Sequence, residues 1–103
     1  MDTHYLISDE EIIKVVSPKK HVKEGPKFIV CKTSEWAIVA LKWDNCRSLA
    51  IRWFNSNLGN PSSHGNPTWF IIPKELNDCI LSFANSVQHI DIEKIKKYLN
   101  HEI

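Results

Sequence analysis

Apolar residues in the first half of the chain follow the two-residue period that is typical of strands. A short apolar run covers Phe28 to Cys31, and alternating stretches then cover Trp36 to Trp43 and Cys46 to Phe54. Only Asp44 and Asn45 separate the last two stretches, which is the spacing of a tight hairpin. The pattern therefore predicts three antiparallel strands.

The pattern changes to a helical period after a fourth predicted strand. Thr68 to Ile72 has the composition of that strand, and Pro73 follows at the first position of a helix, where its missing amide costs nothing. We expect this helix to run from Pro73 to Val87. Its apolar residues fall on a single stripe, which comprises Leu76, Cys79, Ile80, Phe83, Ala84 and Val87. The stripe is expected to be buried against the sheet.

Two shorter helices are expected near the ends of the chain. Ser8 and Glu11 have the spacing of a capping box, which predicts a helix from Asp9 to about Val16. The basic stretch 17–27 contains prolines and a glycine and is expected to be an exposed connection. A last helix is expected to begin after Asp91, a good N-cap residue.

Together these elements predict an α+β fold. Its four-stranded sheet is mainly antiparallel, the helix from Pro73 to Val87 packs on one face, and the short terminal helices lie beside it. A chain of 103 residues with 43% hydrophobic content is long enough for one core and too short for two. Residues 1–103 are therefore expected to form a single domain.

The apolar runs and the N-terminal sequence indicate where the protein acts. The longest runs, Trp36 to Leu41 and Trp69 to Ile72, are far shorter than the roughly 20 residues of a membrane-spanning helix. The N-terminal residues are acidic and lack the form of a secretory signal. We expect no membrane partner and a cytoplasmic location.

Charge and cysteine usage exclude further classes. Thirteen basic and twelve acidic residues leave a formal charge of +1, which lacks the electrostatic footprint of a general nucleic-acid binder. The cysteines are odd in number, widely spaced and not clustered with histidine at zinc spacing: Cys31, Cys46 and Cys79. We expect free thiols, no metal site and no cofactor.

The segment from Asn55 to Pro67 is the part of the sequence least like scaffold. It has thirteen residues without periodicity, and loops of this length in compact domains are usually functional or disordered. Gly-Asn-Pro occurs at 59–61 and again at 65–67, and these residues restrict the chain to a defined path. The candidate binding residues are Arg52, Asn55, Asn60, Ser62, Ser63, His64, Asn66 and Trp69. The simpler alternative is a long hairpin connection whose serines and asparagines satisfy their own backbone.

Catalysis by this loop is not expected. A serine nucleophile needs a base within reach and an acid to orient that base, yet Ser63 and His64 are adjacent and no acid is marked as their partner. No GxSxG turn occurs either. A phosphate or nuclease site with His64, Arg47 and Arg52 would need a second acid/base group, and nothing in the sequence brings another histidine to His64. No catalytic residue is assigned.

Binding without catalysis leaves two classes of partner. Nucleic acid would use the basic residues Lys14, Lys19, Lys20, Lys23, Lys27, Arg47 and Arg52, with Trp36, Trp43 and Trp53 as stacking platforms. Nucleic acid is not favoured, because these tryptophans fit a core and no known RNA- or DNA-binding motif occurs. Binding a protein partner requires no residue that the sequence lacks. A rigid polar loop beside Arg52 and Trp69 has the composition of an interface, with an aromatic or Arg anchor and a polar rim.

The stretch from Arg52 to Leu81 reads RWFNSNLGNPSSHGNPTWFIIPKELNDCIL, in which an Arg-aromatic strand leads into a G-x-P-[ST]-S-x-G-x-P-T-W-F segment and a proline-started helix. This pattern resembles small bacterial immunity proteins that are encoded beside contact-dependent growth-inhibition toxins. The resemblance implies a cytoplasmic protein that neutralises a cognate toxin domain, often a nuclease. The near-neutral charge departs from the acidic character of many nuclease inhibitors.

The leading hypothesis is therefore a non-catalytic immunity or antitoxin-like inhibitor that binds a toxin domain. The alternative is a small RNA-processing or nucleotide-binding protein that uses the loop from Asn55 to Pro67.

Overall fold

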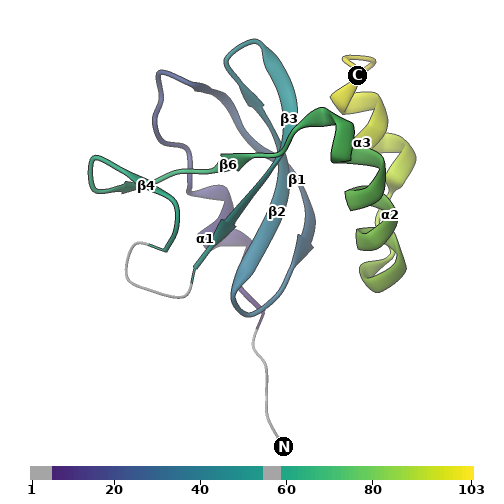
Figure 1. Ribbon diagram of the computed structural model, residues 1–103, viewed down its shortest axis with the longest axis horizontal. Coiled ribbons are helices and arrows are strands. Elements are labelled where there is room, and N and C mark those ends of the chain that lie inside the picture. Colours follow the sequence, from purple (N-terminus) through teal and green to yellow (C-terminus); the bar gives the residue numbers. More distant parts are fainter. Residues whose placement is uncertain (1–5, 55–58) are drawn as a thin grey trace, which may run out of the picture.

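A four-stranded antiparallel sheet forms the centre of the fold (Figure 1). The structure is a computed structural model that describes residues 6–54 and 59–103. The strands are arranged in the order β1-β2-β3-β6, and each neighbouring pair is antiparallel. Their bounds are Val22–Lys32 for β1, Trp36–Trp43 for β2, Cys46–Trp53 for β3 and Phe70–Ile71 for β6. A separate two-stranded sheet pairs β4 (Ser62–Ser63) with β5 (Asn66–Pro67).

Helices cover both faces of the main sheet, as Figure 1 shows. One face packs against α1, and the other packs against α2 and α3. The helices are α1 (Asp9–Ile13), the 3-10 turn η1 (Lys74–Leu76), α2 (Asn77–Gln88) and α3 (Ile92–Leu99). The α+β class is confirmed, as are its four-stranded antiparallel sheet, the helix on one face and the short terminal helices. The expectation that both terminal helices lie beside that helix is wrong for α1, which covers the opposite face.

The central strand β2 is buried on both sides. Ala37, Val39 and Leu41 belong to the core that α1 covers, whereas Ile38 and Ala40 belong to the core beneath α2 and α3. Successive side chains of a strand point to opposite faces, so a run of apolar residues is needed where both faces are covered. This requirement explains why β2 is apolar from Trp36 to Leu41.

The predicted hairpin between the second and third strands is confirmed. Trp43 pairs directly with Cys46, so Asp44 and Asn45 form a two-residue turn. Asp44 has a φ of +54°, a left-handed conformation that aspartate tolerates better than most residues. The turn therefore forms without the glycine that such hairpins usually carry.

The prediction of an exposed connection over 17–27 is wrong in its second half. Val22 and Glu24 already pair with β2, so β1 begins at Val22. The register shifts between Glu24 and Phe28, a stretch that includes Pro26, which has no amide to donate. This irregularity removes the strict alternation by which a strand is recognised in a sequence.

The first helix is correctly placed but shorter than predicted, because it ends at Ile13. Its capping box is present. Ser8 Oγ accepts a hydrogen bond from the Glu11 amide at 3.2 Å, and the Ser8 amide donates to Glu11 Oε1 at 3.4 Å. Ile12 and Val15 are both buried, so packing on the sheet continues past the last helical turn.

The last helix follows its prediction closely. Asp91 is the N-cap, and its side chain accepts a hydrogen bond from the Lys94 amide at 3.1 Å. Ile95 and Tyr98 are buried on the side that faces the sheet. Within residues 6–54 and 59–103, no helix is both long and apolar enough to cross a membrane.

The prediction that the apolar stripe of α2 is buried against the sheet is wrong for most of its residues. The buried residues of α2 are Leu81 and Ala84, with Ile80 partly buried. Four residues of the stripe face solvent: Leu76, Cys79, Phe83 and Val87. Leu81 lies outside the stripe, beside Ala84 on the helix surface, and both of these residues are buried. Packing through Leu81 and Ala84 turns the centre of the stripe away from the sheet.

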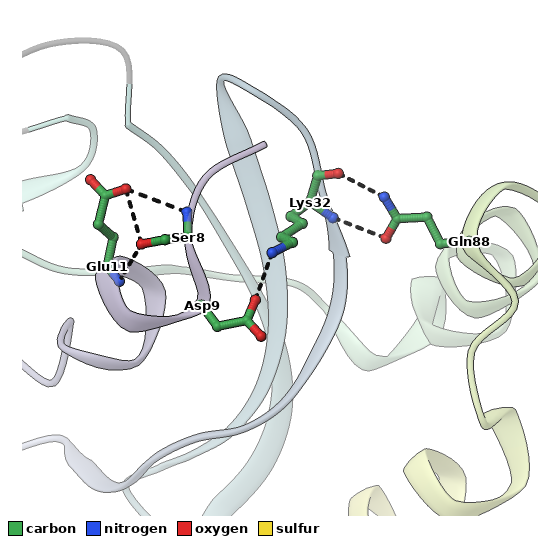
Figure 2. A network of polar contacts seen from close by, with 5 residues as sticks. All are labelled: Ser8, Asp9, Glu11, Lys32 and Gln88. Atoms are coloured by element: carbon green, nitrogen blue, oxygen red, sulfur yellow. Dashed lines mark hydrogen bonds and ion pairs between the residues drawn. The ribbon is translucent and has the colours of Figure 1, made fainter. Parts of the chain in front are cut away.

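A polar network holds α1 and α2 to the edge strand β1 (Figure 2). The side-chain amide of Gln88 donates through Nε2 to the Lys32 carbonyl oxygen at 2.7 Å, and the backbone amide of Lys32 donates to Gln88 Oε1 at 3.3 Å. Lys32 Nζ forms an ion pair with Asp9 Oδ1 at 2.6 Å. Gln88 thus pairs with β1 as a neighbouring strand would, which shields this part of an exposed sheet edge.

Candidate functional site

The described part of the predicted loop begins at Gly59 and contains a small hairpin. Ser62 pairs with Pro67, and Ser63 pairs with Asn66. Asn55, one of the predicted binding residues, lies outside the described residues.

The turn of this hairpin consists of His64 and Gly65. Their φ values are +52° and +80°, the left-handed conformation that a type I′ hairpin turn requires at both central positions. Glycine adopts it freely, whereas histidine does so at a cost of about 1 kcal/mol. His64 is exposed at the tip of the hairpin, and Ser62 and Asn66 are exposed beside it.

Arg52 holds the base of the loop from inside the protein. Only 1% of its surface is exposed. Its Nη1 donates to the Pro61 carbonyl oxygen at 2.9 Å and to the Thr68 carbonyl oxygen at 2.7 Å, which lie on either side of the hairpin. The guanidinium also lies over the Phe54 ring, 4.9 Å from its centroid. Burial lowers the pKa of Arg52. Arg52 therefore shapes the loop and is not a surface group that a partner could contact.

Backbone contacts fix the entrance of the loop. The Trp53 amide donates to the Asn60 carbonyl oxygen at 2.7 Å, and the Asn60 amide donates to the Trp53 carbonyl oxygen at 3.0 Å. The Asn60–Pro61 peptide bond is cis. Gly59 has a φ of +67°, and a Cβ atom there would overlap Arg52 Nη2 and the Trp53 carbonyl oxygen. Glycine is thus required at this position for two separate reasons.

Trp69 also belongs to the interior. It is buried in the core that α1 covers, and its Nε1 donates to the Val15 carbonyl oxygen at 2.8 Å. The Phe54 ring packs edge-on against it at a centroid distance of 6.5 Å. Of the predicted binding residues, Arg52 and Trp69 support the loop from below. The described residues that remain accessible on it are Asn60, Ser62, His64 and Asn66, with Ser63 partly buried.

The described part of the loop shows no relay of the kind that serine catalysis uses. Among the described residues, no hydrogen bond joins His64 to Ser62 or Ser63, or to a carboxylate. Elsewhere among the described residues, His21 contacts a carboxylate: its Nδ1 lies 2.8 Å from Asp44 Oδ1 at the turn between β2 and β3. Its ring stacks on Trp43 at a centroid distance of 5.2 Å. In the part of the chain that the structure describes, no three His, Cys, Asp or Glu side chains group to hold a metal ion.

A second surface was missed by the sequence analysis because its residues were expected to be buried. Leu76 at the end of η1 is 47% exposed, and Phe83 and Val87 on α2 are 50% and 53% exposed, respectively. Phe83 and Val87 line a shallow groove of about 390 Å³ together with Leu6 and Trp36. We define the α2 apolar face as Leu76, Cys79, Phe83 and Val87. The sequence did show the apolar stripe, but periodicity does not tell whether a partner element belongs to the same chain.

The fold and these surfaces define an α+β protein with two accessible features, the hairpin tip and the α2 apolar face. Comparison of the chain with protein-family models, with curated proteins and with solved structures finds no match.

Proposed function

We propose that this chain is a non-catalytic bacterial binding protein, and more specifically an immunity or antitoxin-like inhibitor that neutralises a toxin domain in the cytoplasm. The observation that carries the binding function is the α2 apolar face. Large apolar side chains that lie together on an exposed helix are typical of protein-protein contact sites. The specific inhibitor function rests on the resemblance of the stretch from Arg52 to Leu81.

The energetics favour a protein partner for this face. Complete burial of a leucine, valine or phenylalanine side chain stabilises by about 1.5 to 3 kcal/mol. Leu76, Phe83 and Val87 are about half exposed, so covering them would add roughly 1 kcal/mol each. Such a contribution suits the apolar centre of an interface with the polar residues of α2 as its rim, and further contacts must offset the cost of association.

The hairpin of β4 and β5 is the second contact surface that we propose. Its backbone is held from below by Arg52, so little conformational entropy is lost when a partner orders Ser62, His64 and Asn66. In Figure 1 the hairpin and α2 lie on opposite sides of the main sheet. Their contributions to binding can therefore be separated by mutation.

The first prediction concerns the α2 apolar face. If the gene beside this one encodes a toxin-like protein, co-expression of the two should protect cells from it. Replacement of Phe83 and Val87 by serine should weaken binding about tenfold or more in calorimetry, because two half-exposed apolar contacts are lost. Ser82→Ala, on the same helix and also exposed, should bind as the unaltered protein does.

Three results would count against this proposal. Failure of the neighbouring product to bind would remove the inhibitor function. Equal binding by the serine variant would exclude the α2 apolar face, and His64→Ala would then show whether the hairpin is the contact. Ribonuclease activity of the purified protein that His64→Ala abolishes would favour the RNA-processing alternative.

A further inference from the structure

A groove of about 650 Å³ lies where β1, the start of β3 and α3 meet. Its volume falls within the range of small-molecule sites. The side chains that define it are Glu24, Lys27, Phe28, Arg47, Lys94 and Tyr98. It is separate from both the hairpin and the α2 apolar face, and the sequence places its residues in three distant stretches.

Arg47 is the fixed cation of this groove. Its Nη1 donates to the Tyr98 carbonyl oxygen at 3.1 Å and to a carboxylate oxygen of Ile103, the last residue, at 2.6 Å. The guanidinium lies 4.4 Å from the centroid of the Tyr98 ring, so its plane is held against an aromatic surface. Arg47 Nε is buried and has no hydrogen-bond partner among the described residues.

The Glu24 carboxylate in the groove already accepts a hydrogen bond. Glu24 Oε1 accepts a hydrogen bond from the Tyr98 hydroxyl at 3.0 Å, whereas its distance to Arg47 Nε is 3.8 Å. Burial, together with Glu24, raises the pKa of Tyr98, so the hydroxyl stays a donor at neutral pH. Glu24 therefore compensates the charge of Arg47 only in part.

Two lysines add to this positive charge. Lys27 and Lys94 are exposed at the groove, and neither forms an ion pair with any residue in the described part of the chain. Lys94 Nζ lies 6.0 Å from the centroid of the Phe28 ring. Lys27, Lys94 and Arg47 give the groove three positive charges, against the negative charges of Glu24 and of the Ile103 carboxylate, which also lines it. The excess of one positive charge attracts anions.

Phe28 provides a flat apolar wall beside these charges. Its ring is partly buried and packs edge-on against Tyr98 at a centroid distance of 5.5 Å. An aromatic ring of a ligand could stack on the accessible part of Phe28 while its anionic group meets the lysines.

We propose that this groove binds a small organic anion in which a phosphate or carboxylate is attached to a flat ring. The ring lies on Phe28, and the anionic group lies among Lys27, Lys94 and Arg47. Phosphate and carboxylate share the chemistry that these cations recognise, so the experiment must tell the two apart.

The second prediction is tested by titration of the isotope-labelled protein with four probes, followed by NMR. Phenyl phosphate and benzoate carry both parts of the ligand, inorganic phosphate lacks the ring, and benzyl alcohol lacks the charge. Phenyl phosphate, benzoate or both should cause saturable shifts at Phe28, Arg47 and Lys94 and should bind more tightly than the other two probes. The tighter of the first two identifies the anionic group.

Matched lysine variants distinguish binding in the groove from general attraction of anions to the positive charges of the protein. Lys94→Gln should weaken binding about tenfold, as expected for loss of one charge-assisted hydrogen bond, and Lys27→Gln should also weaken it. Lys97→Gln removes the same charge from an exposed position that does not line the groove, and should leave the affinity unchanged. Absence of saturation with both ring-bearing anions, or equal losses in Lys94→Gln and Lys97→Gln, would overturn the proposal.

Discussion

Single residues under the hairpin decide its shape. Arg52 donates to the carbonyl oxygens of Pro61 and Thr68 on either side of β4 and β5, and Gly59 lets the chain pass close above it. The Pro61 oxygen also accepts from the Thr68 amide at 3.0 Å, so it keeps a donor if Arg52 is replaced. An unsatisfied buried acceptor costs about 1 to 3 kcal/mol, so the contact with the Thr68 oxygen makes Arg52 a structural residue of the loop.

The two glycines of the loop allow a controlled test, which is the third prediction. Gly65→Ala should destabilise by about 1 kcal/mol, because the φ of +80° is unfavourable for alanine while no atom lies within 4 Å of the new Cβ. Gly59→Ala should cost about 2 to 4 kcal/mol, since it adds an overlap with Arg52 and the Trp53 carbonyl to a similar backbone strain. Urea unfolding measures both values. Equal losses would mean that the loop moves aside and that its base is not tightly held.

Between elements, the contact of α2 with β1 sets the orientation of the helix. Gln88 at the end of α2 makes two hydrogen bonds with the backbone of Lys32, while Leu81 and Ala84 pack below. These contacts leave Phe83 and Val87 on the outer side. The side-chain amide of Gln88 therefore adds to apolar burial in fixing the orientation of α2.

The fourth prediction follows from this amide. Gln88→Glu keeps an acceptor for the Lys32 amide but replaces the donor by a charged oxygen that faces the Lys32 carbonyl. We expect a loss of about 0.5 to 1.5 kcal/mol and faster hydrogen exchange at the end of β1. Ser82→Ala on the same helix serves as the control and should change neither quantity. Unchanged exchange in Gln88→Glu would show that the edge of β1 is protected by other contacts.

Across the whole molecule, Tyr98 couples α3 to β1 through Glu24, and this contact makes stability depend on pH. The pKa of Tyr98 is raised in the folded state, first by burial and then by Glu24. A tyrosine in the unfolded chain loses its proton near pH 10, about its ordinary pKa. The folded state holds the proton more tightly, so the stability due to Tyr98 is complete below about pH 10 and is lost as pH rises further.

The fifth prediction is that the free energy of unfolding falls as pH increases from about 9 to about 11, and that Tyr98→Phe makes this fall smaller. The two proteins differ in this one hydroxyl, so the difference between the two slopes isolates the tyrosine. Urea unfolding at several pH values provides the measurement. Parallel slopes would contradict a raised pKa for Tyr98, whatever the overall stability of the variant.

The sequence by itself determined the elements that depend on neighbouring residues. The hairpin at Asp44 and Asn45, the capping box at Ser8 and the N-cap at Asp91 were all predicted, because each involves contacts within a few residues. The α+β class followed from these elements and from the period of their apolar residues.

Tertiary structure alone decided which faces are accessible. Arg52 was predicted to bind a partner and is buried, because the strand face on which it lies is covered by the loop that it holds. The α2 apolar face was predicted to be buried and is exposed, since periodicity marks an apolar side without naming what covers it. The groove joins Lys27, Arg47 and Lys94 from separate elements, and only the packing of α3 beside β1 and β3 brings their charges together.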